Sequence, residues 1–163
     1  MPGRGVSRRR ANQQANDMSL TAKLQNAASV QAGLDLAVDA FGAQSGTVHR
    51  FDAKARLLIL AAQRNIPPGV VEVIGQIPIG KGLAGLAAQK REPVRICNLQ
   101  TDNSGTVRPG ARATGMEGAI AVPMLVAGEM KGVLGVAKAV AYDWTDAETQ
   151  VLLEAASVIA SRL

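Results

Sequence analysis

Aromatic residues, cysteine and histidine are scarce in this sequence. Aromatics make up 2% of its 163 residues, and the chain has one cysteine and one histidine. The core is therefore expected to be aliphatic, and platforms on which nucleic-acid bases stack are few. One cysteine excludes an internal disulfide. Together, one cysteine and one histidine leave no set of zinc ligands, and no residue pattern identifies a cofactor.

Long hydrophobic runs are also missing. No apolar stretch reaches the ~18 residues of a membrane-spanning helix, and the N-terminus lacks the apolar segment of a secretory signal. The length fits one domain of ordinary size. Together with the single cysteine, these features predict a cytoplasmic protein with one folded domain and no membrane partner.

Positive charge is concentrated at the N-terminus. The net charge is +5, yet residues 1–16 hold four arginines and no acid. The rest of the chain is nearly neutral, with 14 basic and 13 acidic residues. Residues 1–17 have too few apolar side chains to form a core, which predicts a disordered basic tail before a domain at 18–163. We therefore expect nucleic-acid binding to be weak, salt-sensitive and confined to this Arg-rich tail.

Hydrophobic spacing predicts helices and strands along the domain. Apolar residues recur every three or four positions from about Ser19 to Gly42, which is typical of a helix that Gly33 bends or divides. Thr145 and Glu148 form a capping box at the start of a final helix, whose apolar stripe is wider than one surface requires. Shorter patterns predict strands at 47–51, 57–62, 77–79, 93–97, 118–126 and 131–140, and short helices at 70–74 and 83–89.

A long, glycine-rich segment from Asn98 to Glu117 interrupts these elements. Long loops inside a domain usually have a function, and we expect this one to close over a ligand. Its arginines favour a small anion or a carboxylate. Each residue taken alone also has an ordinary alternative, as a solvated loop residue, a core methionine or a strand histidine. The predicted ligand contacts are, first, Arg112 and Thr114, and then Met116, Asp102, Arg108 and His49.

Gly80, Gly82 and Gly85 spell G-x-G-x-x-G after a short predicted strand. A dinucleotide site is not expected, because the helix that follows is too short for a usual crossover and no repeated βαβ units follow. A tight turn with positive φ angles is the simpler interpretation. No serine lies in a G-x-S-x-G motif, and Cys97 and His49 lie in different predicted strands, so no catalytic residue is assigned.

The order of these elements resembles a GAF domain from about Leu20 to Leu163. Two stretches carry the resemblance, "IPIGKGLAGLAAQKREPVRICNLQTD" and "AIAVPMLVAGEMKGVLGVAKAVAYDWTDAET". The resemblance implies an α/β (α+β) fold with a central antiparallel sheet. It places the N- and C-terminal helices on one face and the short helices with the long loop on the other. It also implies a sensory role in signal transduction, while the ligand differs among such domains.

The chain departs from better-known GAF subtypes. Free methionine sulfoxide reductases share the glycine turn, but one cysteine cannot run their dithiol cycle. Bilin-binding members need a cysteine beside a pocket histidine, which nothing in the sequence provides. Cyclic-nucleotide-binding members carry an Asn-Lys, Phe and Asp-Glu signature, where this chain has Ala137-Lys138, Trp144 and Glu148-Thr149. An ion pair between Lys138 and Glu148 is the expected structural role of that lysine.

These observations predict a small-molecule-binding regulatory domain rather than an enzyme. Ligand occupancy would reach a signalling partner through the terminal helices, whose excess apolar surface also predicts a homodimer. Two alternatives stay open: a redox or hydrolytic enzyme that uses Cys97, and a dimerisation module without a ligand. A cavity with convergent polar groups would favour the receptor, whereas a cavity filled by Met and Leu would favour the dimerisation module.

Overall fold

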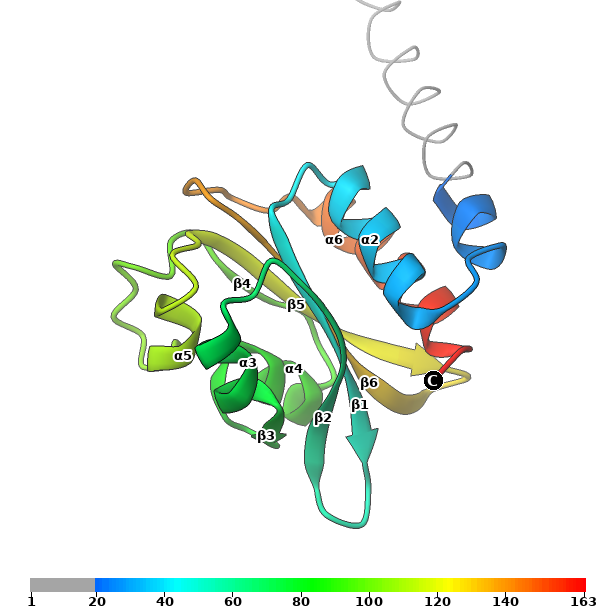
Figure 1. Ribbon diagram of the computed structural model, residues 1–163, viewed down its shortest axis with the longest axis horizontal. Coiled ribbons are helices and arrows are strands. Elements are labelled where there is room, and N and C mark those ends of the chain that lie inside the picture. Colours follow the sequence, from blue (N-terminus) through cyan, green and yellow to red (C-terminus); the bar gives the residue numbers. More distant parts are fainter. Residues whose placement is uncertain (1–19) are drawn as a thin grey trace, which may run out of the picture.

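Residues 20–163 are described by a computed structural model, shown in Figure 1. Its helices are α2 (Val30–Ala40), α3 (Pro68–Ile74), α4 (Gly82–Lys90), α5 (Pro109–Arg112) and α6 (Asp146–Ala160), and residues 20–25 are also helical. Its strands are β1 (Ser45–Asp52), β2 (Leu57–Arg64), β3 (Gln76–Pro78), β4 (Val94–Ile96), β5 (Gly118–Val126) and β6 (Glu129–Lys138). The tail at 1–17 lies outside the described residues, so its disorder and its nucleic-acid binding stay predictions.

The strands form one antiparallel sheet in the order β3-β2-β1-β6-β5-β4. Two hairpins, β1–β2 and β5–β6, meet where β1 pairs with β6, although these strands are far apart in the sequence. The edge strands β3 and β4 have three residues each. Such short edges limit pairing with other chains, and the centre of the sheet consists of β1, β6 and β5.

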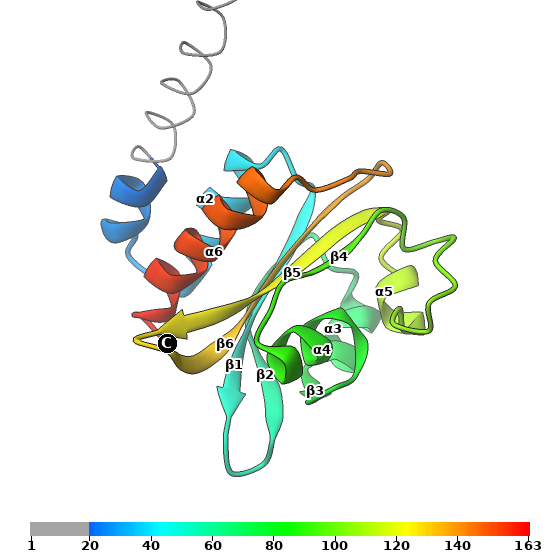
Figure 2. The same ribbon diagram turned by 180° about the vertical axis from the view of Figure 1, so that it is seen from behind.

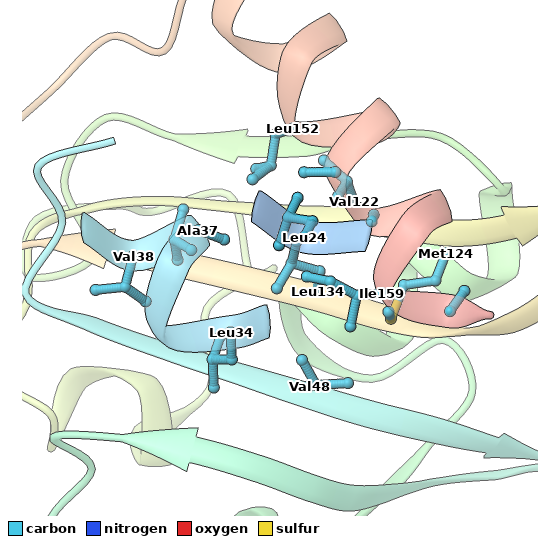
Figure 3. Packing of buried hydrophobic residues seen from close by; sticks show 14 of the residues in the cluster. Leu24, Leu34, Ala37, Val38, Val48, Val122, Met124, Leu134, Leu152 and Ile159 are labelled. Atoms are coloured by element: carbon cyan, nitrogen blue, oxygen red, sulfur yellow. The ribbon is translucent and has the colours of Figure 1, made fainter. Parts of the chain in front are cut away.

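One face of the sheet is covered by α2 and α6 (Figures 1 and 2). Alternate residues of the central strands point to this face, and Val48, Val122 and Leu134 are fully buried there. Figure 3 shows them packed with Leu34 of α2 and Ile159 of α6. Because large aliphatic side chains occupy every second strand position, this layer holds the main hydrophobic core.

The opposite face carries α3, α4 and α5 (Figure 2). There α4 packs on β5 and β6 in a smaller core of five buried residues, Leu58, Ala87, Ala88, Ala121 and Val133. The predicted fold class is therefore confirmed: a mixed fold with an antiparallel sheet, terminal helices on one face, and short helices with the long loop on the other. The ends of the strands and short helices differ only slightly from those predicted.

The first long predicted helix is divided at residues 26–29 rather than at Gly33. Ser29 caps α2, because its hydroxyl accepts a hydrogen bond from the Ala32 N–H at 3.1 Å. Gly33 lies inside α2, where an added Cβ would approach Ile159 of α6 at 3.1 Å. The small size of Gly33 therefore allows two helices to approach closely, which is a different role from the bend that was predicted.

The capping box of α6 is confirmed. The Thr145 hydroxyl accepts a hydrogen bond from the Glu148 N–H, and the Glu148 carboxylate accepts one from the Thr145 N–H, both at 3.1 Å. Asp146 adds a second negative charge at the positive end of the helix dipole. With 15 residues, α6 is the longest described helix, and none within residues 20–163 combines the length and apolar character of a membrane span.

Gly46 of β1 provides a test of the main core. An added Cβ would lie 2.7 Å from Val38 and 3.1 Å from the Gly135 carbonyl oxygen, so Gly46→Ala overpacks the contact between β1 and α2. We expect it to lower the free energy of unfolding by about 1–3 kcal/mol in urea titrations. Gly69→Ala is the control, because its added Cβ meets no atom within 4 Å. Equal stability of the two variants would contradict this packing.

Candidate functional site

A cavity of about 430 Å³ lies between the sheet and the layer of α3, α4 and α5. Its floor has four small residues, Ala119 and Ala121 of β5 and Gly135 and Ala137 of β6. They face one another across the two strands, Ala119 opposite Ala137 and Ala121 opposite Gly135. A close-packed interior needs larger side chains at these positions. The cavity therefore follows from the small residues on this face of the central strands.

Two short helices form the roof of the cavity. They meet closely, because an added Cβ at Gly110 of α5 would lie 3.4 Å from Val73 of α3. The residues that they turn toward the cavity are almost all apolar, which suits a ligand with an apolar body. These residues are Val70, Val73 and Ile74 of α3, and Pro109, Gly110 and Ala111 of α5.

The glycine turn brings the N-terminus of α4 to the cavity. Gly80 and Gly82 have φ angles of 87° and 67°, which confirms the predicted tight turn, since glycine adopts such angles without strain. Lys81, Gly82, Leu83 and Ala84 all line the cavity. No side chain caps this helix, so its first backbone N–H groups are available to another acceptor.

The segment at 98–117 borders the cavity and is held by its own hydrogen bonds. The Gln100 side-chain amide donates to the carbonyl oxygens of Arg112 at 3.1 Å and Met116 at 2.8 Å. The Arg112 guanidinium donates to the carbonyl oxygen of Asp102 at 2.8 Å. Except for the four residues of α5 it is irregular, as predicted, and these bonds give it a defined course.

Arg108, Thr114 and His49 are the predicted ligand contacts that line the cavity. The Arg108 side chain passes the first turn of α4, since an added Cβ at Gly82 would lie 3.4 Å from Arg108 Cδ. The Thr114 hydroxyl is already engaged, because it donates to the Ala111 carbonyl oxygen at 2.6 Å. Among these three residues, Arg108 therefore combines a position at the cavity with a positive charge.

Arg112, Asp102 and Met116 are not among the residues that line the cavity. The Arg112 guanidinium donates to the backbone carbonyl oxygen of Asp102, and the Met116 N–H donates to the Thr114 hydroxyl at 3.2 Å. In this structure all three shape the loop. Contact between any of them and a ligand stays a prediction.

Sequence reasoning missed the floor of the cavity, the contribution of α3, and Lys81. A signal for the floor was present, because small residues alternate with large aliphatic ones along β5 and β6. Lys81 was overlooked because its motif was judged only as a dinucleotide fingerprint. The sequence carries no comparable signal for the contribution of α3 to the roof, because that contribution depends on how the helix packs against the rest of the domain.

The charges around the cavity have one sign. Lys81 and Arg108 line it, whereas none of its lining residues is Asp or Glu. Two cations beside low-dielectric walls create a positive potential, which attracts anions. The arrangement therefore fits a negatively charged ligand better than a neutral or positive one.

His49 is a buried, neutral histidine beside the cavity. It is 1% exposed, and its Nε2 lies 2.9 Å from the Ile74 carbonyl oxygen. Burial lowers its pKa below the usual value of 6.5, although the hydrogen bond to Ile74 acts in the opposite direction. Because a carbonyl can only accept, Nε2 carries the proton and Nδ1 is an acceptor, and Nδ1 has no partner among the described residues.

Cys97 is exposed and lies outside the cavity lining. A hydrogen bond with Asp143 raises the pKa of its thiol. A raised pKa keeps the thiol protonated and weakens it as a nucleophile. Within residues 20–163, no group of three or more His, Cys, Asp and Glu side chains is placed to hold a metal ion.

Known proteins share the fold of this chain. The family model described as GAF domain matches residues 28–163. The chain belongs to the GAF domain family. This confirms the resemblance carried by the glycine turn and by the closing hairpin and helix. No curated protein matches the chain.

Solved structures share the fold of this GAF domain. The GAF domain of a phosphoenolpyruvate-protein phosphotransferase from Coxiella burnetii is 17% identical with a TM-score of 0.77, and the match covers 93% of this chain and 92% of that one. The corresponding Acinetobacter domain is 18% identical, with a TM-score of 0.73 and coverages of 91% and 90%. Free methionine-R-sulfoxide reductase from Neisseria meningitidis, in complex with its substrate, is 18% identical, with a TM-score of 0.68 and coverages of 92% and 84%.

The prediction that the chain is not an enzyme is overturned by this last comparison. A reductase has the same GAF fold, so neither the fold nor the family excludes catalysis. Identity of 18% shows the fold alone, and it assigns no reductase activity to this chain. The absence of a second cysteine was therefore too narrow a ground for excluding every enzymatic role.

His49 makes the stability of this domain depend on pH. Because burial lowers its pKa below 6.5, the unfolded chain binds a proton more readily than the folded one. The free energy of unfolding should therefore be level above about pH 7 and fall as the pH drops below 6.5, by at most about 1.4 kcal/mol per pH unit.

The matched variant for this test is His49→Gln, whose side-chain amide can still donate to Ile74. It should remove the slope between about pH 5 and pH 7, because His49 is the only histidine and free carboxyl groups titrate lower. Urea titrations at several pH values measure both proteins. The same slope in wild type and variant would rule out His49 as its source.

Proposed function

We propose that this GAF domain is a receptor for a small organic or inorganic anion, which binds in the cavity between the sheet and α3–α5. The observation that carries the proposal is an apolar cavity whose charged lining residues, Lys81 and Arg108, are both positive. Its volume of about 430 Å³ falls within the ~300–1,000 Å³ typical of small-molecule sites. A cavity that is open rather than filled by Met and Leu also favours a receptor over a dimerisation module.

The first turn of α4 supports an anionic ligand. Its backbone N–H groups are uncapped, and the positive end of a helix dipole attracts negative charge. Arg108 packs beside this turn and can offer two parallel N–H donors to a carboxylate or phosphate. Lys81 adds a second charge at the same place. We assign the acidic group of the ligand to these residues.

A route from the cavity to α6 runs through the end of β6. The long loop is joined to this strand, because the Leu99 N–H donates to the Glu117 carbonyl oxygen and the Glu117 N–H to that of Lys138, both at 2.8 Å. The Lys138 ammonium lies 3.8 Å from the centre of the Tyr142 ring. The Tyr142 hydroxyl in turn donates to the Glu148 carboxylate at 2.8 Å.

These contacts replace the direct ion pair that was expected between Lys138 and Glu148. Lys138 reaches Glu148 through the Tyr142 ring and hydroxyl, and Glu148 caps α6. A change in the loop can therefore shift the start of α6 without moving the whole sheet. We propose that a signalling partner reads this change on the layer of α2 and α6. A cytoplasmic location stays a prediction from the sequence.

Thermal shift with nitrate, phosphate, butyrate, hexanoate, AMP and cyclic AMP tests the receptor. A ligand of the folded state raises the melting temperature as its concentration rises. Arg108→Ala should weaken the binding of each hit about tenfold or more, because a charge-assisted contact is lost. Arg50→Ala is the matched control, since that arginine is exposed on β1 and lies outside the cavity lining.

Ala137→Phe fills the floor of the cavity and should abolish the shift for every ligand. If hits bind this variant as tightly as wild type, the ligand lies elsewhere. An equal loss in Arg108→Ala and Arg50→Ala would contradict the assignment of the acidic group to Arg108. If no class of anion shifts the melting temperature of the wild type, the proposed function fails.

The homodimer is the remaining part of this proposal. Part of the wide apolar stripe of α6 is covered within the chain, by α2 and by Leu20 and Leu24 of the preceding helical segment. Val151 and Val158 of α6 are only half-buried and lie two helical turns apart on one flank. We propose that this flank, together with α2, meets a second copy.

Sedimentation of Val158→Glu tests the homodimer. A buried charge would disrupt the contact, so we expect folded monomers at concentrations where the wild type is dimeric. Val140→Glu is the matched control, because Val140 is 59% exposed and lies outside α2 and α6. A wild-type chain that stays monomeric at high micromolar concentration would rule out the dimer.

A further inference from the structure

A row of polar side chains crosses the apolar floor of the cavity. Ser45, Thr47 and His49 occupy alternate positions of β1 and all line the cavity. Gly46 and Val48 between them face α2 and α6. Next to β1, the strand β6 contributes Gly135, Val136 and Ala137 to the lining, and the Cα partners of Ser45 and Thr47 on β6 are Ala137 and Gly135. On the central strands β1, β6 and β5, the polar side chains of the lining therefore all come from β1, and the other polar lining residue of the sheet is Gln76 at the edge strand β3.

Some polar atoms of this row have no hydrogen-bond partner within residues 20–163, although His49 Nε2 is paired with the Ile74 carbonyl oxygen. His49 is 1% exposed, and its Nδ1 is buried without a partner among residues 20–163. The Ser45 and Thr47 hydroxyls are not among the buried unpaired atoms, and both residues line the cavity. Within residues 20–163, Trp144 Nε1 is also buried without a partner, but Trp144 packs in the main core and does not line the cavity. Burying unpaired polar groups is unfavourable, so a partner from outside the chain would stabilise the row.

The register of the sheet leaves Thr47 uncovered. Thr47 pairs with Gly135 across β1 and β6. An added Cβ at Gly135 would lie 3.3 Å from the Thr47 hydroxyl oxygen. Glycine at this position therefore keeps space open next to the hydroxyl. The next pair, Ser45 opposite Ala137, likewise places only a methyl group beside a serine.

We infer that the Ser45–Thr47–His49 row binds an uncharged, hydrogen-bonding end of the ligand, opposite the acidic group at α4. This inference rests on the proposed function, because it assumes that the cavity receives a ligand. It names the ligand class more narrowly: a small organic acid that carries a hydroxyl group remote from its acidic group. The hydroxyl of the ligand would form a hydrogen bond with the Thr47 hydroxyl, as donor or as acceptor. Ser45 and His49 lie next to Thr47 in the row.

Matched pairs of acids test this inference by titration calorimetry. The probes are butyrate and hexanoate, each compared with its ω-hydroxy derivative. Wild type should bind the better of the two hydroxy acids about three- to tenfold more tightly than its parent, since it gains a hydrogen bond to a partner that is otherwise unpaired. Thr47→Val has nearly the same shape without the hydroxyl, and it should abolish this preference.

Two further variants complete the test. Gly135→Ala places a methyl group against the Thr47 hydroxyl and should reduce the preference without removing any polar group. Thr101→Val makes the same substitution at an exposed threonine that does not line the cavity, and it should change nothing. Unfolding of each variant in urea checks that it is folded.

The possible results distinguish a failure of this inference from a failure of the proposed receptor function. Equal binding of hydroxy and parent acids by wild type overturns the inference, although binding that Ala137→Phe abolishes would still support the receptor. A preference that persists in Thr47→Val also overturns it. If neither hydroxy acid binds, the ligand class is wrong, and the broader thermal-shift screen decides separately whether the cavity receives any anion.

Discussion

The two faces of the central strands differ in side-chain size, and the rest of the structure depends on this difference. Toward α2 and α6, β5 and β6 present Val122, Leu134 and other large aliphatics that fill a dry core. Toward α3–α5, the same strands present alanine and glycine next to Val133, so the covering helices cannot fill the space. Because side chains alternate along a strand, alternate residues of the same strands support a close-packed core on one face and a cavity on the other.

The main core and the cavity lie in different layers, on opposite faces of the sheet. The main core joins elements from both ends of the described chain, since residues 20–25, α2 and α6 all pack on it. The cavity layer consists of short helices, with seven residues in α3 and four in α5. Short elements with few buried contacts open at lower cost than the core does. A ligand can therefore reorganise this layer without unfolding the domain.

The GAF fold by itself leaves the chemistry of the cavity open. Relatives with this fold include parts of phosphotransferases and a reductase that acts on a small substrate. In this chain, the lone cysteine is outside the cavity and its thiol pKa is raised by Asp143. The cavity instead offers cations at α4 and neutral polar groups on β1. Those groups carry the proposal that the cavity receives a small acid.

Local patterns in the sequence determined much of the fold. The capping box at Thr145 and Glu148 depends on residues three positions apart, and the glycine turn depends on backbone angles that few other residues adopt. Alternating hydrophobicity located β5 and β6 almost completely. These features could be predicted because the interactions that cause them lie within a few residues along the chain. Their order also carried the resemblance to the family.

Tertiary structure alone decided which residues meet at the cavity. The sequence prediction placed Arg112 before Arg108 as a ligand contact, but Arg112 is bound to the Asp102 carbonyl oxygen while Arg108 packs beside Gly82 of α4. The space next to Thr47 likewise depends on Gly135, a residue from the far end of the chain that only the β1–β6 register brings opposite it. Composition and periodicity carry no information about such long-range pairing, because they describe each strand separately from its partners.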